Sequence, residues 1–538
     1  MTSYVPTIEP IIKPKKYLMW FRRDLRVHDN TALTMLFDDV NQILSNDINE
    51  SVPPILAVYT ITPKQWLEHD MSLVQMDFIF RTLKQLATTL FIKLGIPLKI
   101  INSDTFTNSV TAIKELCTTQ SITHVFANIE YESNEQARDS LLDKLLDKHN
   151  IKFNRYHDQC ILTPNTIKTG DDSMYKVFTP FYKKWQSILE ASPVQVYPVP
   201  VAINKTATSS DDEHLKMLLK TIDSYHEQTI ELFKLYYGIK QSTVDAILKN
   251  TYEDYPAGES QAQKRLKEFV KEDIVNYNTA RDKPALMATS QMSAYLTVGS
   301  ISARVCYHQA NKLLNAFNQA NTKGESETSQ TDIERWISEL AWRDFYRHVI
   351  SYRPDILKGS AYKIVTDKKV EWSYDNDDFK KWCEGRTGVP LVDAAMRCLN
   401  ATGFMHNRLR MVTAMFLTKD LLIDWRLGER YFMQHLIDGD FASNNGGWQW
   451  SASTGVDASP YFRIMNPFSQ AKTHDEKAIF IKTWLPELRD MPPTILHDEA
   501  KLRQALSTKG KFANVDYPQP MVEHKQARLY AIQQFKQQ

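Results

Sequence analysis

The sequence lacks the features that mark small secreted, metal-binding or membrane proteins. Its five cysteines, in 538 residues, form no C-x-x-C pair, so neither a zinc cage nor a disulfide framework is predicted. No apolar run reaches the ~18 residues that a membrane helix needs, and the first residues do not form a signal peptide. We therefore expect no metal and no membrane association. The expected location is intracellular: cytoplasmic for a bacterial source, which is favoured, and nuclear for a eukaryotic one.

The chain also lacks a large net charge and the glycine-rich loops that bind nucleotide phosphates. Its 65 Lys and Arg residues nearly balance 64 Asp and Glu residues, for a formal charge of +1. A nucleic-acid partner would therefore have to meet a local basic patch. Neither a G-x-G-x-x-G motif nor a Walker loop is present, so a nucleotide-like ligand would be held without a cradle of that kind. The length predicts two or three domains.

Short β-rich runs alternate with helical patterns through the first third of the chain. The predicted strands are residues 17–21, 55–60, 98–102 and 123–128, with a long amphipathic stretch from Ser72 between the second and the third. This alternation predicts a parallel sheet covered by helices on both faces. After about residue 265 long helical patterns dominate. The expected organisation is an α/β domain over residues 16–155, a connector over 156–264 and an all-α domain over 265–538.

The stretch DGDFASNNGGWQW, residues 438–450, combines two acids, two asparagines, two glycines and two tryptophans. A glycine inside a helix costs about 1 kcal/mol against alanine, and a turn has little use for two tryptophans, so the stretch is predicted to belong to a site. If it is helical, Trp448 and Trp450 lie about 200° apart, one facing inward and one toward an opening. A buried Asp438 would need a cation, for which Arg410 is the candidate. The alternative is an Asx-rich turn that caps a helix.

A helical pattern in ERWISELAWRDFYRH, residues 334–348, brings Trp336, Glu339 and Arg343 to one face. Glu339 could hydrogen-bond a planar ligand while Trp342 stacks on it. The alternative is a core helix with a Glu–Arg pair on its surface.

The segment TGFMHNRLRM, residues 402–411, places polar side chains on different sides of a predicted helix. Asn407 and Met411 point the same way, whereas Arg408 and Arg410 lie about 200° apart and must have different surroundings. One arginine could pair with a buried acid and the other with a nucleic-acid backbone. Two solvated surface arginines are the alternative.

The segment ATSQMS, residues 288–293, precedes another helical pattern. Its hydroxyl residues Thr289, Ser290 and Ser293 can cap that helix. They can also present backbone N–H groups to a phosphate, although plain capping is the simpler interpretation.

Together these segments resemble the photolyase/cryptochrome family, and within it the class I photolyases that repair cyclobutane pyrimidine dimers (CPDs) in DNA. The resemblance runs from MWFRRDLRVHDNTAL (19–33) through MYKVFTPF (174–181) to DYPQPMVEHKQAR (516–528), and is densest across residues 385–411 and 420–467. It implies an α/β antenna-binding domain and an all-α domain that binds FAD and repairs DNA. The implied protein is a monomer in which photoexcited reduced FAD gives an electron to a flipped-out dimer in damaged DNA.

The resemblance assigns most of the candidate residues to the flavin. Asn444 would lie against flavin N5. Trp448, Trp425 and Trp372 would relay an electron from the surface to a photoexcited oxidised flavin. The residues implied to hold FAD are Tyr277, Thr289, Ser290, Gln291, Met292, Ser293, Trp336, Arg343, Asn407, Arg410, Asp438, Gly439, Asp440 and Asn444.

The remaining candidates are implied to contact DNA or a second chromophore. Glu339 would hydrogen-bond the thymine carbonyl edge and stabilise the radical anion of the dimer. The other residues implied for the lesion and its DNA are Trp342, Trp450, Asn407, Arg408, Met411, Arg281 and Gln470. Asn134, Glu135, His69 and Lys358 match the antenna site of folate-binding members, which favours 5,10-methenyltetrahydrofolate over a deazaflavin.

Two sequence positions discriminate among members of the family. (6-4) photolyases carry two histidines where this chain has Asn407 and Met411, and cryptochromes usually replace the residue at the position of Asn444 by Asp or Cys. Both positions favour CPD repair, and a (6-4) photolyase or a cryptochrome blue-light receptor remains the alternative. A light-independent flavin reductase is disfavoured because no dinucleotide fingerprint is present.

Overall fold

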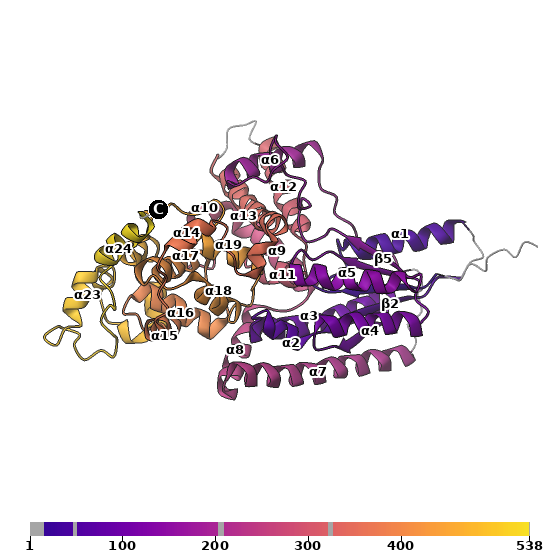
Figure 1. Ribbon diagram of the computed structural model, residues 1–538, viewed down its shortest axis with the longest axis horizontal. Coiled ribbons are helices and arrows are strands. Elements are labelled where there is room, and N and C mark those ends of the chain that lie inside the picture. Colours follow the sequence, from indigo (N-terminus) through magenta and orange to yellow (C-terminus); the bar gives the residue numbers. More distant parts are fainter. Residues whose placement is uncertain (1–14, 47–50, 203–208, 321–326, 537–538) are drawn as a thin grey trace, which may run out of the picture.

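The computed structural model describes residues 15–46, 51–202, 209–320 and 327–536 (Figure 1). Its first part contains a five-stranded parallel sheet with the order β3-β2-β1-β4-β5. The strands are β1 (Tyr17–Phe21), β2 (Ile55–Ile61), β3 (Leu98–Asn102), β4 (His124–Asn128) and β5 (Lys152–Tyr156). The first four confirm the predicted strands. The fifth is not among them, because this edge strand has the polar sequence KFNRY and contains no fully buried residue.

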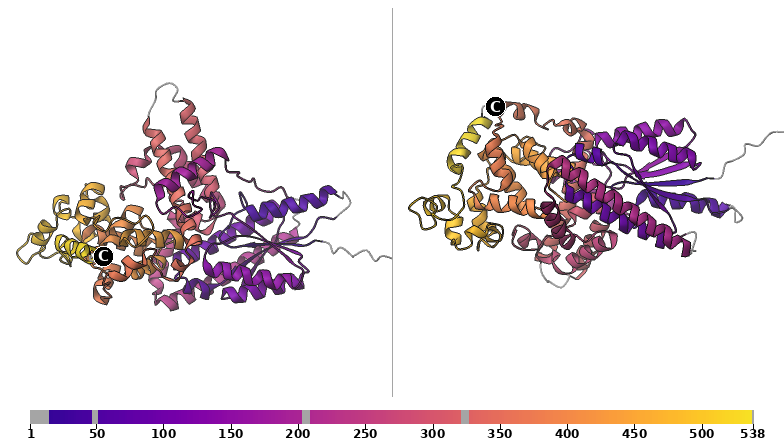
Figure 2. Two further views of the ribbon diagram at one scale, coloured as in Figure 1. Left: turned by 45° about the horizontal axis from the view of Figure 1, so that its top comes forward. Right: turned by 90° about the horizontal axis from the view of Figure 1, so that it is seen from below.

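Helices cover both faces of the sheet, as predicted. Side chains alternate across a strand, so Tyr17, Met19 and Phe21 of β1 enter one hydrophobic core, whereas Leu18 and Trp20 enter another. The helical layers are visible on either side of the sheet in the left view of Figure 2. The helices that complete the first core are α1 (Thr31–Asn46) and α3 (Leu73–Thr89), and those that complete the second are α4 (Phe106–Thr119) and α5 (Ser133–Asp147).

The region predicted as a connector is largely helical where it is described; residues 203–208 lie outside the described part. It contains α6 (Phe178–Ala191), α7 (Ser209–Tyr237), α8 (Gln241–Asp254) and the first part of α9 (Glu259–Glu272). The long helix α7 packs along α3 and β3 (Figure 1). Lys84 of α3 pairs with Asp223 of α7 at 2.7 Å, and the ring of His226 stacks on that of Phe80. Within the connector, α7 therefore forms an additional layer on the α/β part, whereas α6 packs against α13 of the helical part.

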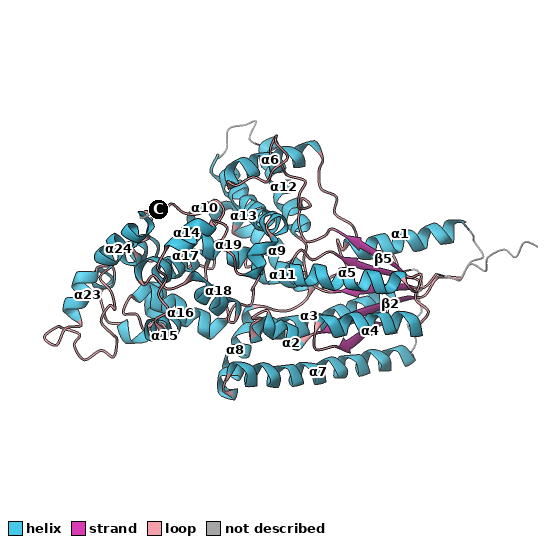
Figure 3. Cartoon of the chain, viewed as in Figure 1, coloured by secondary structure: helices cyan, strands magenta, loops and turns pink. Residues whose placement is uncertain are grey.

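The rest of the described chain is helical, and the strands are confined to the other end of the molecule (Figure 3). The helices from here onward are α10 (Tyr277–Ala280), α11 (Ser293–Val298), α12 (Ala303–Ala320), α13 (Glu327–Tyr352), α14 (Ile364–Lys369), α15 (Asn376–Glu384), α16 (Pro390–Thr402), α17 (Asn407–Met415), α18 (Trp425–Met433), α19 (Phe441–Ala452), α20 (Pro467–His474), α21 (Ile479–Trp484), α22 (Pro493–Leu496), α23 (Glu499–Ala505) and α24 (His524–Lys536). None of the helices in the described ranges has the length and apolar composition of a membrane span.

Candidate active site

Two aspartates just before α19 are each paired with an arginine. Arg410 donates to both carboxylate oxygens of Asp438, at 3.0 and 2.9 Å, which confirms the predicted pair. Arg347 of α13 donates to Asp440 at 2.6 Å, and both of these side chains are buried. This second pair was not predicted. Helical spacing could have indicated Arg347 as a site residue, because it follows Arg343 by four residues and shares its helical face.

The turn that carries the two aspartates is fixed by the first turn of α3, from the α/β part of the chain. The Ser72 hydroxyl donates to the Leu436 carbonyl, and the Gln75 amide donates to the Gly439 carbonyl, both at 2.7 Å. Asp440 is also the N-cap of α19, where its carboxylate accepts a backbone N–H bond. The capping interpretation is therefore correct for Asp440, and the two parts of the chain meet at this turn.

The electrostatics of this cluster are dominated by two arginines, Arg347, which is buried, and Arg343, which is half-buried. Burial raises the pKa of Asp440, but the guanidinium groups of Arg347 and Arg343 outweigh that effect and hold the pKa well below its usual range. Burial lowers the pKa of Arg343 to about 10, and the charge of Arg347 adds to this effect. Arg343 donates to the carbonyls of Gln159 and Leu296 and forms no ion pair within the described chain. A half-buried cation without an ion-pair partner in the described chain suits an anionic or carbonyl-bearing ligand.

The helices around this cluster contain buried polar atoms without a hydrogen-bond partner. Within the described ranges they include Nε and Nη1 of Arg347, Oε1 of Gln291, Nε1 of Trp448 and Nε2 of His406. Buried polar groups in proteins are normally hydrogen-bonded, so the orphaned donors and acceptors around this cluster are available to a polar ligand. Guanidinium and amide groups match the phosphate and ring oxygens of a flavin dinucleotide. The residues present therefore fit FAD.

The segment before α11 does not form the predicted hydroxyl cap. The helix begins at Ser293, its N-cap is Met292, and no side chain accepts a capping hydrogen bond there. The Ser290 hydroxyl instead accepts from the Met292 N–H at 3.4 Å. Gln291 has a φ of 52°, in the left-handed region, which turns the chain and buries both Gln291 and Met292 while Ser293 stays exposed. The capping prediction is wrong.

The three tryptophans predicted as an electron relay differ in burial. Trp448 and Trp425 are 2% and 0% exposed, whereas Trp372 is half-buried. The ring of Trp448 lies against Gly428, where any side chain would collide with it. Trp425 and Trp372 donate their indole N–H groups to the same carboxylate oxygen of Asp367, at 3.0 and 3.2 Å. This shared acceptor was not predicted.

The two tryptophans of α19 have different surroundings, as their spacing predicts. Trp448 is buried in the helical core and Trp450 is half-buried. Trp342 of α13, predicted as a second wall of the lesion pocket, stacks on Phe178 of α6 with ring centroids 3.7 Å apart. Phe178 lies in the MYKVFTPF segment but was not predicted as a site residue. It covers one face of Trp342.

The charged residues predicted to contact the lesion and DNA form ion pairs within the protein. Glu339 is paired with Arg281, and Arg408 is paired with Asp282 at 2.5 Å. DNA phosphates would have to replace these carboxylates as partners of the two arginines. The remaining predicted lesion and DNA residues are Asn407, which is exposed, and Met411 and Gln470, which are half-buried.

Other predicted flavin residues are buried or held by hydrogen bonds. The rings of Tyr277 and Trp336 both pack against Phe269. The Asn444 amide donates to the Glu429 carbonyl at 2.9 Å, which fixes its orientation. Burial raises the pKa of the Glu429 carboxyl to about 7. Thr289 and Ser290 are half-buried.

Three of the four predicted antenna residues meet in the structure. The Asn134 amide lies 2.8 Å from Nε2 of His69, and Nδ1 of His69 lies 3.8 Å from the Glu135 carboxylate. Lys358 is exposed at the end of a short 3₁₀ segment, and within the described residues no contact joins it to the other three. Burial, reinforced by the negative charge of Glu132, raises the pKa of Glu135 to about 8.

We expect Glu135→Gln to reduce the pH dependence of stability in protein free of antenna chromophore. The pKa of Glu135 is raised from 4.5 to about 8, so between these values the folded state keeps a proton that the unfolded chain has released. The stabilisation is full below the unfolded pKa and is lost as pH rises through the folded pKa. As pH rises from about 5 to about 8, the Tm of the wild type should therefore fall more than the Tm of the variant. Equal slopes of Tm against pH in the two proteins would contradict this assignment.

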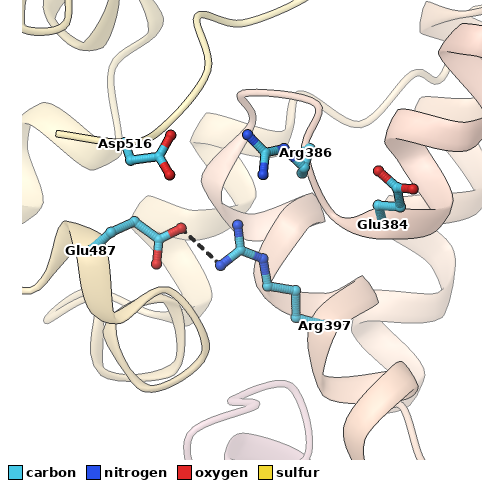
Figure 4. A pocket seen from close by; sticks show the side chains of 5 residues that line it. All are labelled: Glu384, Arg386, Arg397, Glu487 and Asp516. Atoms are coloured by element: carbon cyan, nitrogen blue, oxygen red, sulfur yellow. Dashed lines mark ion pairs between the residues drawn. The ribbon is translucent and has the colours of Figure 1, made fainter. Parts of the chain in front are cut away.

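A separate charged pocket of about 380 Å³ lies between α15, α16 and the C-terminal part of the chain (Figure 4). It is lined by Glu384, Arg386, Arg397, Glu487 and Asp516. Arg397 and Glu487 pair across it at 2.8 Å. The lining carries both signs of charge and shares no residue with the cluster described above.

The parallel α/β sheet, the helical part and the arginine–aspartate cluster together define a two-part flavoprotein. Comparison with known families identifies it further. A family model described as the FAD binding domain of DNA photolyase matches residues 336–537, and one described as DNA photolyase matches residues 17–200. The chain belongs to the photolyase/cryptochrome family.

Curated relatives match along nearly the whole chain. The deoxyribodipyrimidine photo-lyase of Escherichia coli (strain K12) is 41% identical over 517 residues, which cover 96% of this chain and 97% of the relative. The mitochondrial deoxyribodipyrimidine photo-lyase of Saccharomyces cerevisiae is 37% identical over 96% of this chain and 86% of its own length. Among solved structures, the class III photolyase of Agrobacterium tumefaciens is similar with a TM-score of 0.76 and 28% identity, over 99% of this chain and 100% of that one.

Proposed function

We propose that the protein is a light-driven CPD photolyase, a carbon–carbon lyase that uses photoexcited reduced FAD to split pyrimidine dimers in damaged DNA. One observation carries the proposal. Buried Arg347 and half-buried Arg343 lie beside Asp440 at the start of α19, and the same helix carries Trp448 buried in the core and Trp450 half-buried. The similarity to proteins named deoxyribodipyrimidine photo-lyase supports the same function.

The residues of the chain would bind and orient both reactants. A bound reduced flavin supplies the excited-state electron that opens the cyclobutane ring. Arg343 and the pairs Arg410–Asp438 and Arg347–Asp440 would hold the cofactor, because their charges are already fixed by burial and hydrogen bonds. A dimer inside a duplex cannot reach the cofactor and must be flipped out, and flipping costs least where base pairing is already damaged. Trp342 and Trp450 would then stack on the bases of the flipped-out dimer.

Glu339 would contribute the polar contact to the flipped dimer. In the structure without DNA, the Glu339 side chain pairs with Arg281. When DNA binds, Arg281 would pair with a phosphate instead, and Glu339 could then hydrogen-bond the thymine edge. In that role the Glu339 carboxyl would donate its O–H to a thymine carbonyl, and a hydrogen-bond donor already positioned where negative charge develops stabilises that charge without reorganisation.

Replacing Glu339 tests this role. Glu339→Ala should lower the repair yield per absorbed photon several-fold while FAD remains bound, because the dimer radical anion loses its hydrogen-bond partner. The measurement is the quantum yield on a CPD-containing oligonucleotide, with Glu253→Ala, an exposed glutamate of α8, as the matched control. An unchanged yield in Glu339→Ala would assign Glu339 a structural role only.

Replacing Arg281 or Arg408 should weaken binding to damaged DNA in a salt-dependent way. Each phosphate contact contributes about 0.9 to the slope of log K against log salt on duplex DNA, so loss of either arginine should lower the slope by about one. Arg386→Ala, an exposed arginine in the separate charged pocket, should leave the slope unchanged. Wild-type slopes in both Arg281→Ala and Arg408→Ala would place the DNA surface elsewhere.

The proposal also includes the second chromophore and the organisation of the chain. Asn134, Glu135 and His69 would hold 5,10-methenyltetrahydrofolate, and a strong near-ultraviolet absorption band in the purified protein would test this. The domains would be 16–155 for the antenna, 156–264 for the connector and 265–538 for FAD and repair. The protein would act as a monomer, in the cytoplasm of a bacterium or the nucleus of a eukaryote.

A further inference from the structure

One buried carboxylate contacts two members of the predicted relay. Oδ1 of Asp367 accepts the indole N–H of Trp425 at 3.0 Å and that of Trp372 at 3.2 Å. The backbone carbonyl of Asp367 also accepts from Trp372 at 3.2 Å. Asp367 lies on α14 and is 9% exposed. The second and third tryptophans of the series are therefore hydrogen-bonded to a single anionic group.

A cation is placed asymmetrically beside this carboxylate. Nη2 of Arg426 lies 2.6 Å from Oδ2 of Asp367, and the Arg426 guanidinium lies 4.4 Å from the centre of the Trp425 ring. Bonds to the carboxylate of Asp424, at 3.1 Å, and to the Gly359 carbonyl, at 2.8 Å, hold Arg426 in that place. In the described part of the chain, no cation lies over the ring of Trp372.

The innermost tryptophan has no such partner. Nε1 of Trp448 is buried and makes no hydrogen bond within the described residues. Its ring packs edge-on against those of Phe432 and Trp382, at centroid distances of 4.9 and 6.0 Å. Neither of these neighbours carries a charge.

These surroundings rank the three rings by their ability to carry a positive charge. Trp448 has only uncharged ring neighbours. Trp425 has the carboxylate on its N–H, but the guanidinium over its ring repels a positive charge there, because the normal attraction of a cation depends on the electron-rich ring face. Trp372 has the carboxylate, no cation on its ring and partial access to water. A positive charge on an indole is therefore more stable at each step outward.

We propose that Asp367 is a positioning residue of the electron relay: it supplies the negative counter-charge that keeps the positive charge on the two outer tryptophans, and Arg426, which lies over Trp425 alone, biases that charge toward Trp372. The inference rests on the proposed flavin-dependent function and on the electron relay that the family resemblance predicts for these three tryptophans. One electron moves from Trp372 to the oxidised Trp425, which returns to the neutral indole. Trp372 becomes the radical cation beside the carboxylate, and no covalent bond forms or breaks. The oxidant is the photoexcited oxidised flavin, which has taken one electron from Trp448.

The test compares Asp367→Asn with Asp367→Glu in the FAD-loaded protein. The asparagine keeps an oxygen acceptor for the indoles but removes the charge, whereas the glutamate restores the charge. After a laser flash, the absorption of the tryptophan radical should decay about tenfold faster in Asp367→Asn, equivalent to about 1.4 kcal/mol, and Asp367→Glu should recover most of the lifetime. The ultraviolet resonance Raman band of the indole N–H reports separately whether the hydrogen bonds survive.

Two results would overturn the inference. A wild-type radical lifetime in Asp367→Asn would show that the charge has no role. A short lifetime that Asp367→Glu does not recover, accompanied by loss of the indole hydrogen bonds, would assign Asp367 a structural role alone.

Arg426→Gln keeps the inference testable if Asp367→Asn does not fold. Removing the guanidinium removes its repulsion of a positive charge on Trp425 but leaves the carboxylate shared with Trp372, so a smaller share of the radical should pass on to Trp372 than in the wild type. That share is the part of the long-lived tryptophan-radical absorption that Trp372→Phe removes, and an unchanged share would contradict the inference. Repair of a CPD oligonucleotide by wild-type protein with chemically reduced FAD tests the proposed function independently. Failure of that repair alongside the predicted lifetimes would reject CPD repair while leaving the role of Asp367 in place.

Discussion

Trp448→Phe is expected to abolish light-driven reduction of the oxidised flavin. Phenylalanine fills most of the buried space against Gly428, so the fold should survive, but its ring is much harder to oxidise than an indole. Repair should continue once the flavin is reduced chemically, because the relay supplies electrons to the oxidised flavin and takes no part in the repair step.

Trp450→Ala is expected to have the opposite effect. Trp450 is half-buried on α19 and is predicted to stack on the dimer, and one base–aromatic stack contributes about 1–3 kcal/mol. Dimer binding should weaken by that amount while light-driven flavin reduction persists. Absorption under blue light measures the first property, and a gel shift with a dimer-containing duplex measures the second. Failure of both variants in both assays would make this stretch a shared structural element and disprove the division of roles.

Asp440→Asn should strongly destabilise the protein and weaken FAD retention. Asparagine caps a helix as well as aspartate does, so the start of α19 should persist. The variant nevertheless leaves the buried guanidinium of Arg347 without its counter-charge, and breaking a buried ion pair in this way costs about 3–5 kcal/mol.

Asp375→Asn is the matched control, because Asp375 is an exposed N-cap, on α15, that accepts from Asp377 and Asp378 N–H groups and forms no buried pair. Denaturant unfolding and the flavin absorbance of the purified variants measure the two effects. If both substitutions change stability equally, the Arg347–Asp440 pair contributes nothing beyond capping.

Local features of the sequence predicted the elements, and long-range partners account for most of what was missed. Apolar runs identified the buried strands β1 to β4, but β5 is a half-buried edge strand whose polar residues carry no such signal. Arg410 was matched to Asp438 because a buried acid requires a cation. Arg347 was missed, although its spacing from Arg343 placed it on the same helical face.

The glycines of the tryptophan-containing stretch illustrate a second limit. Their helix propensity argues against a helix, yet α19 includes both Gly446 and Gly447. The ring of Tyr346 from α13 occupies the space where a side chain at position 446 would lie, so tertiary packing overrides local propensity there. The hydrogen bond from Trp425 to the shared acceptor Asp367 likewise could not be predicted, because the two residues lie 58 positions apart along the chain.

The most direct test of CPD repair is to illuminate the protein, with its flavin reduced, in the presence of an oligonucleotide that contains a single CPD. Dimers should be converted to intact pyrimidines in the light and not in the dark, and an oligonucleotide carrying a (6-4) lesion should be unchanged. Conversion of the (6-4) lesion instead of the CPD, or no conversion of either lesion under illumination by protein that retains FAD, would contradict CPD repair.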